Sequence, residues 1–182
     1  MDKNVKAIHA ANARYVEEFG DKGSLPHHPT RHFAVVTCMD CRLDPAKFAG
    51  LAEGDANVIR NAGGRVSEDA IRSLLISYKM LGTKEWFVIQ HTHCGMMGFT
   101  NEEARELFAS DAHVHGIDPT EAHYIDFMPI SGTIEENLVR DVRRLRTHPL
   151  VPASIVIHGY VYDVHTGRLI VCEEAEKIGA AT

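Results

Sequence analysis

The chain has 182 residues, a hydrophobic content of 45% and a charged content of 24%, which are typical values for a soluble globular protein. Its formal net charge of −6 does not favour a nucleic-acid or anionic-membrane partner. The sequence contains no apolar run of membrane-spanning length and no recognisable signal peptide. We therefore expect a cytoplasmic protein, with a single domain over residues 1–182.

Residues 1–30 are predicted to form an N-terminal helical arm and a linker. Apolar residues recur near helical spacing from Val5 to Phe19, and Asp2 can cap the helix. Gly20 and Pro26 then break the pattern. Because this helix stands apart from the motifs that follow, it either packs on its own domain or reaches a partner subunit.

The rest of the chain alternates short β-rich runs with helical patterns. Helices are predicted after Ser67 and Thr133, which are suitable N-cap residues. Strands are predicted at residues 33–37, 57–60, 86–90 and 155–158, with a closing hairpin of residues 160–162 and 169–171. This alternation predicts an α/β fold: a mostly parallel central β-sheet flanked by helices on both faces.

Two segments do not fit the alternating pattern simply. Residues 98–130 are rich in acids and histidines and have little apolar periodicity, so we predict a long loop insertion there. The helix after Thr133 carries Asp141 among four arginines, and we predict that these charges form a solvated face. The arginines are Arg140, Arg143, Arg144 and Arg146.

Two of the predicted strands end in potential metal ligands. Cys38 follows the first strand, and His91 and Cys94 follow the third. If those strands are neighbours in a parallel sheet, their carboxyl ends bring these residues to one place. Two thiolates and an imidazole suit zinc, and three protein ligands leave a fourth position for water, which is typical of a catalytic site. In a reducing compartment these cysteines are thiols or ligands rather than disulfides.

Asp40 and Arg42 lie two residues apart, directly after the first potential ligand. In an extended segment, alternate residues share a face. Asp40 can accept a hydrogen bond from a metal-bound water, or it can occupy the fourth metal position itself. Arg42 can hold the carboxylate in a bidentate pair and keep it from the metal. A plain ion pair is the alternative, but beside a metal the catalytic interpretation is favoured.

The pattern Cys38-x-Asp40-x-Arg42 followed by His91-x-x-Cys94 resembles the paired signature of the β-class carbonic anhydrases. The resemblance implies one Zn²⁺ per subunit on the two cysteines and the histidine, with Asp40 and Arg42 as the catalytic dyad. It also implies an α/β fold that forms a homodimer or a dimer of dimers, with the N-terminal helix embracing the partner.

The reaction that the resemblance implies is hydration of carbon dioxide to bicarbonate by a zinc-bound hydroxide. The strings around Cys38 and His91 are most similar to a short-chain branch of the family that also contains carbonyl sulphide hydrolases. Conversion of carbonyl sulphide to carbon dioxide and hydrogen sulphide on the same zinc site is therefore the alternative function. The two activities share their motifs, so the motifs do not separate them.

Cys41 departs from the family pattern, which usually has a small residue at that position. With Cys38, His91 and Cys94 it offers a fourth ligand, and so a closed structural zinc site. Its spacing from Cys38 also matches a redox pair. This third hypothesis, a non-catalytic zinc or redox module, gives Asp40 and its neighbouring arginine no role.

Overall fold

The computed structural model describes residues 2–116 and 118–182, apart from the side chains of residues 111–115. Within that part of the chain, five strands form one sheet in the order β2-β1-β3-β4-β5. The first four strands pair in parallel and β5 is antiparallel to β4, which confirms the predicted mostly parallel sheet. The strands are β1 (Phe33–Cys38), β2 (Ala56–Asn61), β3 (Glu85–His91), β4 (Val156–Tyr162) and β5 (Leu169–Val171).

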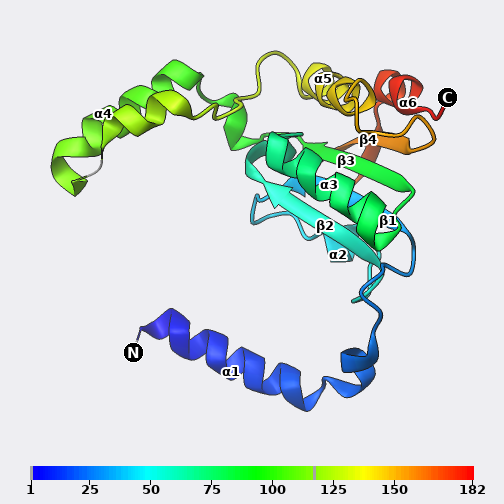
Figure 1. The fold of residues 1–182 in the computed structure, drawn as a ribbon. Coiled ribbons are helices and arrows are strands. Elements are labelled where there is room, and N and C mark those ends of the chain that lie inside the picture. Colours follow the sequence, from blue (N-terminus) through cyan, green and yellow to red (C-terminus); the bar gives the residue numbers. More distant parts are fainter. Residues whose placement is uncertain (1, 117) are drawn as a thin grey trace.

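The main core lies between one face of the sheet and three helices (Figure 1). These helices are α3 (Glu68–Leu81), α5 (Ile134–Arg146) and α6 (Glu173–Gly179). The predicted caps are confirmed: Ser67 accepts a hydrogen bond from the first turn of α3, and Thr133 forms a capping box with Glu136. Fully buried side chains such as Trp86 and Leu138 fill the space between the layers.

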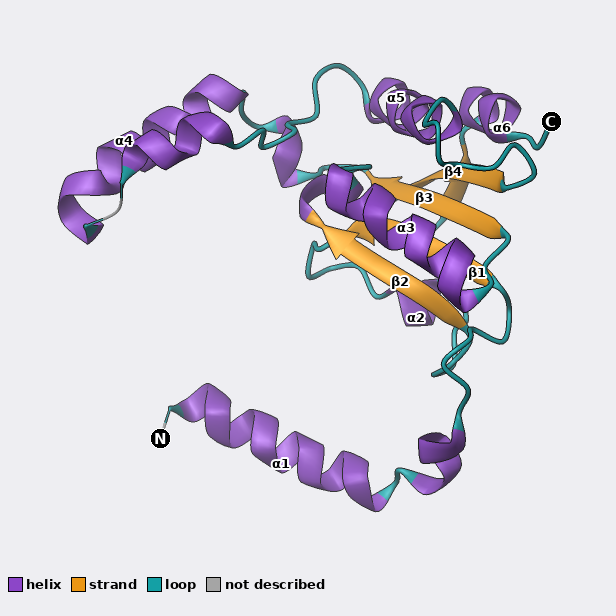
Figure 2. Ribbon diagram, viewed as in Figure 1, coloured by secondary structure: helices purple, strands orange, loops and turns teal. Residues whose placement is uncertain are grey.

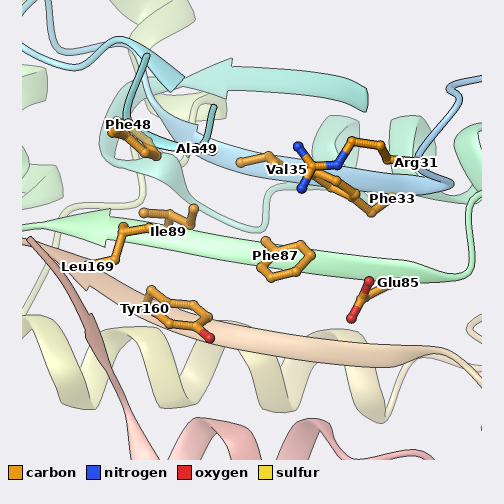
Figure 3. Close-up of a pocket in the computed structure, with 10 residues that line it drawn as sticks. All are labelled: Arg31, Phe33, Val35, Phe48, Ala49, Glu85, Phe87, Ile89, Tyr160 and Leu169. Carbon is orange, nitrogen blue, oxygen red and sulfur yellow. The ribbon is translucent and has the colours of Figure 1, made fainter. Parts of the chain in front are cut away.

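The opposite face of the sheet is largely uncovered. The buried apolar cluster on that face is small and consists of Phe33, Val35 and Ile89, beside the short helix α2 (Pro45–Phe48). Phe87 and Tyr160 extend this face, which encloses a hollow of about 470 Å³ (Figure 3). The predicted helical cover of this face is therefore limited, in the described part of the single chain, to the short helix α2.

Two helices project away from the sheet (Figures 1 and 2). The first is α1 (Lys3–Glu17), which confirms the predicted arm and has no buried residue. The second is α4 (Asn101–His115), followed by the 3₁₀ segment η4 (Pro119–Tyr124). The prediction of an irregular loop over residues 98–130 is thus wrong. Because α4 extends beyond the core, its sequence lacks the apolar stripe that identifies a packed helix.

Two smaller differences concern the C-terminal part of the chain. The strand predicted at 155–158 and the hairpin arm predicted at 160–162 form one continuous strand, β4, which begins at Val156 and ends at Tyr162. Helix α6 was not predicted, since a seven-residue segment with three acids in its first turn gives little periodic signal.

No helix in the described part of the chain combines the length and apolar character needed to cross a membrane.

Candidate metal centre

The structure brings the three predicted metal-ligand residues together. Cys38 ends β1 and His91 ends β3, and these strands are adjacent and parallel. Cys94 follows in the turn after β3. The sulfur atoms of Cys38 and Cys94 are 4.0 Å apart, and all three ligand atoms lie within 4.8 Å of one another. The parallel pairing of β1 with β3 therefore produces the cluster that was predicted from the residues at the ends of these strands.

The chemistry of this cluster fits zinc. Cys38, His91 and Cys94 are all buried. Two thiolates at about 2.3 Å from a tetrahedral zinc would lie about 3.8 Å apart, close to the separation observed. His91 Nδ1 donates to the Thr92 carbonyl at 2.9 Å, which leaves a lone pair on Nε2. That Nε2 atom is buried without a hydrogen-bond partner, as a metal-ligand nitrogen would be before the metal is added.

The two thiols share a proton. A hydrogen bond from Cys94 is the main cause that lowers the pKa of Cys38, to about 4. The same hydrogen bond raises the pKa of Cys94 above its ordinary range. The backbone amide of Asp40 donates to the Cys38 sulfur at 3.4 Å and also favours the thiolate. These hydrogen bonds therefore favour a thiolate at the position where a cation would bind.

The predicted pair of Asp40 and Arg42 is present beside the cluster. Arg42 donates from Nε and Nη2 to the two carboxylate oxygens at 2.9 and 2.6 Å, and its backbone amide donates at 2.9 Å. These hydrogen bonds hold the pKa of Asp40 well below its usual range. Asp40 Oδ2 lies 3.7 Å from His91 Nε2, so an ionised carboxylate faces the candidate metal position.

A turn of glycines supports the cluster from β2. We call residues Ala62–Gly64 (η2) the glycine turn. Gly64 has a φ of +61°, and a Cβ there would lie 2.8 Å from the Cys38 nitrogen and 2.9 Å from the Thr37 carbonyl carbon. Only glycine allows this approach.

Comparisons with known proteins identify the family of this chain. A family model described as carbonic anhydrase matches residues 33–169. The chain belongs to the β-carbonic anhydrase family. The β-carbonic anhydrase 1 of Mycobacterium tuberculosis is 40% identical over 162 residues, which cover 88% of this chain and 92% of that protein. A carbon disulfide hydrolase from an Acidianus strain is 39% identical over 159 residues, 76% of each chain.

Structural similarity supports the same family. The solved carbonic anhydrase from Glaciozyma antarctica has a TM-score of 0.86 and 43% identity to this chain, covering 94% of this chain and 99% of that one. The fold is therefore that of a β-carbonic anhydrase. Relatives of this chain carry two different names, carbonic anhydrase and carbon disulfide hydrolase, so membership of the family does not by itself decide the substrate.

Cys41, the departure from the family pattern, lies outside the cluster. Its side chain is exposed, whereas the three clustered residues are buried. The group of ligand atoms found among the described residues does not include its sulfur. The four cysteines are free thiols. This arrangement favours an open three-ligand site over the closed four-ligand alternative.

The sequence interpretation missed one group near the site. Asp141, predicted to be on a solvated face, is only 2% exposed and pairs with Arg65. The expectation was wrong because the partner lies 76 residues away and helical spacing alone does not reveal it. The available signal was the position of Asp141 within the apolar stripe, between Leu138 and Val142.

Proposed function

We propose that the protein catalyses zinc-dependent hydration of carbon dioxide to bicarbonate. The observation that carries this proposal is the unpaired, buried Nε2 atom of His91, which lies with two thiol sulfurs beside an ionised Asp40. Zinc held by Cys38, His91 and Cys94 would keep one position open and lower the pKa of a water there toward about 7.

The chain's own residues would orient the reacting water. Asp40 would accept a hydrogen bond from it at Oδ2, the oxygen closest to His91 Nε2. Arg42 occupies both carboxylate oxygens and also donates to the His93 carbonyl at 3.0 Å, so it ties the carboxylate to the turn after β3. The arginine would thereby keep Asp40 ionised and prevent it from swinging onto the metal.

Hydrolysis of sulfur analogues is the second candidate function. Carbonyl sulphide would yield carbon dioxide and hydrogen sulphide. The similarity to a carbon disulfide hydrolase at 39% identity adds carbon disulfide, which yields two equivalents of hydrogen sulphide per carbon dioxide. All three substrates are small linear molecules with an electrophilic carbon, and an apolar pocket discriminates weakly between such similar shapes.

One set of assays on zinc-loaded protein ranks these functions. Carbon dioxide hydration is followed by stopped flow with a pH indicator, and sulphide release is measured with each sulfur substrate. We expect hydration to have the highest kcat/KM. Dominant sulphide release would replace the first proposal with the second. Absence of all three activities in fully loaded protein would refute both.

We further propose that the protein is a homodimer in which α1 packs on the partner's open sheet face. The apolar side of α1 is exposed, with Ile8 at 68% and Val16 at 62%. The face around Phe87 and Tyr160 is apolar and uncovered (Figure 3). Both surfaces are apolar and exposed in the single chain, and packing α1 of one subunit on this sheet face of its partner would remove both from water.

Sedimentation equilibrium tests this association. Ile8→Asp should shift the protein from dimer to monomer because it places a charge on the apolar side of α1. Ala10→Asp is the matched control, since it adds the same charge about 200° around the helix. Equal behaviour of the two variants would refute the proposed packing.

We also propose a reducing, cytoplasmic location, which would preserve the free thiols.

A further inference from the structure

Helix α5 buries a carboxylate against the part of the sheet that carries the metal centre. Asp141 accepts hydrogen bonds from Arg65 Nε at 2.8 Å and Arg65 Nη2 at 3.2 Å. It also accepts from the Val66 amide at 3.2 Å and the Gln90 side-chain nitrogen at 2.9 Å. The carboxylate therefore connects α5 with both the segment after the glycine turn and the end of β3.

Arg65 directly follows the glycine turn and closes it. The Arg65 amide donates to Asn61 Oδ1 at 2.7 Å, and Asn61 Nδ2 donates to the Arg65 carbonyl at 2.7 Å. Its guanidinium also donates to the carbonyls of Met128 and Pro129. Arg65 thus fixes the C-terminal end of the glycine turn to α5, through Asp141, and to the segment that precedes α5, through Met128 and Pro129.

Gln90 directly precedes His91 and is fully buried. Its amide nitrogen donates to Asp141, and its amide oxygen accepts from Asn137 Nδ2 at 2.9 Å. Both partners lie on α5. The strand end that presents His91 is therefore held to the same helix as the glycine turn.

We propose that Arg65, Asp141 and Gln90 form a positioning cluster for the metal centre. The cluster holds the glycine turn against Cys38 and fixes the backbone that presents His91, although none of its side chains is itself a candidate ligand. The metal ligands on β1 and β3 would then keep their spacing before a metal enters. This inference rests on the proposed zinc site, but not on which substrate is turned over.

Two observations favour positioning over a purely stabilising role. A buried ion pair is often no more stabilising than well-packed apolar side chains of similar volume, so stability alone does not explain its presence. In addition, the glycine turn lies directly against the end of β1, since a Cβ on Gly64 would lie 2.8 Å from the Cys38 nitrogen. Holding the turn therefore acts directly on a candidate ligand.

The test replaces the ion pair with apolar residues. In the double variant Arg65→Met/Asp141→Leu, we expect an unfolding midpoint close to that of the original protein. Zinc affinity, measured by competition with a chromophoric chelator, should fall about 10–100-fold, the usual effect of losing an outer-shell partner. The visible spectrum of the cobalt(II)-loaded protein should change in its thiolate-to-metal and d–d bands.

An exposed ion pair provides the matched control. Arg144 on α5 pairs with Glu68 at the start of α3, so Arg144→Met/Glu68→Leu removes a similar link at the surface. We expect zinc affinity and the cobalt spectrum to remain unchanged in that variant. An equal loss of affinity in both double variants would overturn the proposal, because the effect would then be general.

A folded Arg65→Met/Asp141→Leu protein with the original affinity and cobalt spectrum would also overturn it. If that variant does not fold, Gln90→Met decides, since it keeps the ion pair and should still weaken zinc binding. Unchanged affinity in Gln90→Met would then refute the proposal. These readouts need no turnover, so an original protein that binds zinc but hydrates nothing would refute only the proposed function.

Discussion

Gly64→Ala is the substitution whose effect on the metal centre can be worked out most directly. At a φ of +61°, a residue with a Cβ costs about 1–2 kcal/mol. The new methyl carbon would also lie 2.8 Å from the Cys38 nitrogen and 3.1 Å from the Ile89 oxygen. Both are backbone atoms of the central strands, so the turn must move away, and such overpacking costs about 1–3 kcal/mol.

Gly50→Ala separates these two contributions. Gly50 has the same φ of +61°, but a Cβ there meets no atom within 4 Å. The left-handed backbone penalty and the entropy lost by the unfolded chain are therefore common to both variants. The difference between them isolates the collision with β1, which should lower the melting temperature of Gly64→Ala by a further 2–12 °C or so.

Thermal unfolding of the metal-free proteins measures that difference, and chelator competition measures zinc affinity. Because the glycine turn must retreat from Cys38, Gly64→Ala should also bind zinc about 10–100-fold more weakly. Gly50→Ala should bind zinc normally. Equal melting temperatures and equal affinities for the two variants would show that the turn does not support the metal centre.

Three other substitutions test the catalytic dyad, the role of Cys41 and the cap of α5. Asp40→Asn should lower hydration turnover about 100-fold or more while zinc stays bound, as measured by stopped flow and metal analysis, and unchanged turnover would exclude the dyad. Cys41→Ala should retain zinc and activity, since the thiol is exposed and outside the cluster, and loss of zinc would support the closed site. Thr133→Ala removes the capping box of α5 and should cost about 1 kcal/mol in urea unfolding, and an unchanged midpoint would contradict the cap assignment.

The candidate site could be predicted because its signals are local. Cys38 and His91 each end a short apolar run, and parallel strands bring their carboxyl ends to one edge. Asp40 and Arg42 are two residues apart, so their pairing needed no knowledge of the fold. Ser67 and Thr133 revealed helix starts through the same kind of local chemistry.

The features that the sequence did not reveal depend on distant contacts or on missing ones. Asp141 looked like a surface charge because its partner Arg65 enters from another part of the chain. The helix α4 gave no periodic pattern because it projects away from the sheet (Figure 2). The open sheet face around Phe87 looked like a covered face, since an apolar strand does not indicate which molecule will cover it.

Zinc K-edge X-ray absorption of the loaded protein identifies the atoms bound to the metal. We predict a four-coordinate zinc with two sulfur ligands at about 2.3 Å and two nitrogen or oxygen ligands at about 2.0–2.1 Å. Those ligands would be Cys38, Cys94, His91 and one position outside the protein's Cys-His-Cys set. A shell of three sulfurs would contradict the open three-ligand site, because it would bring Cys41 onto the metal and close the site.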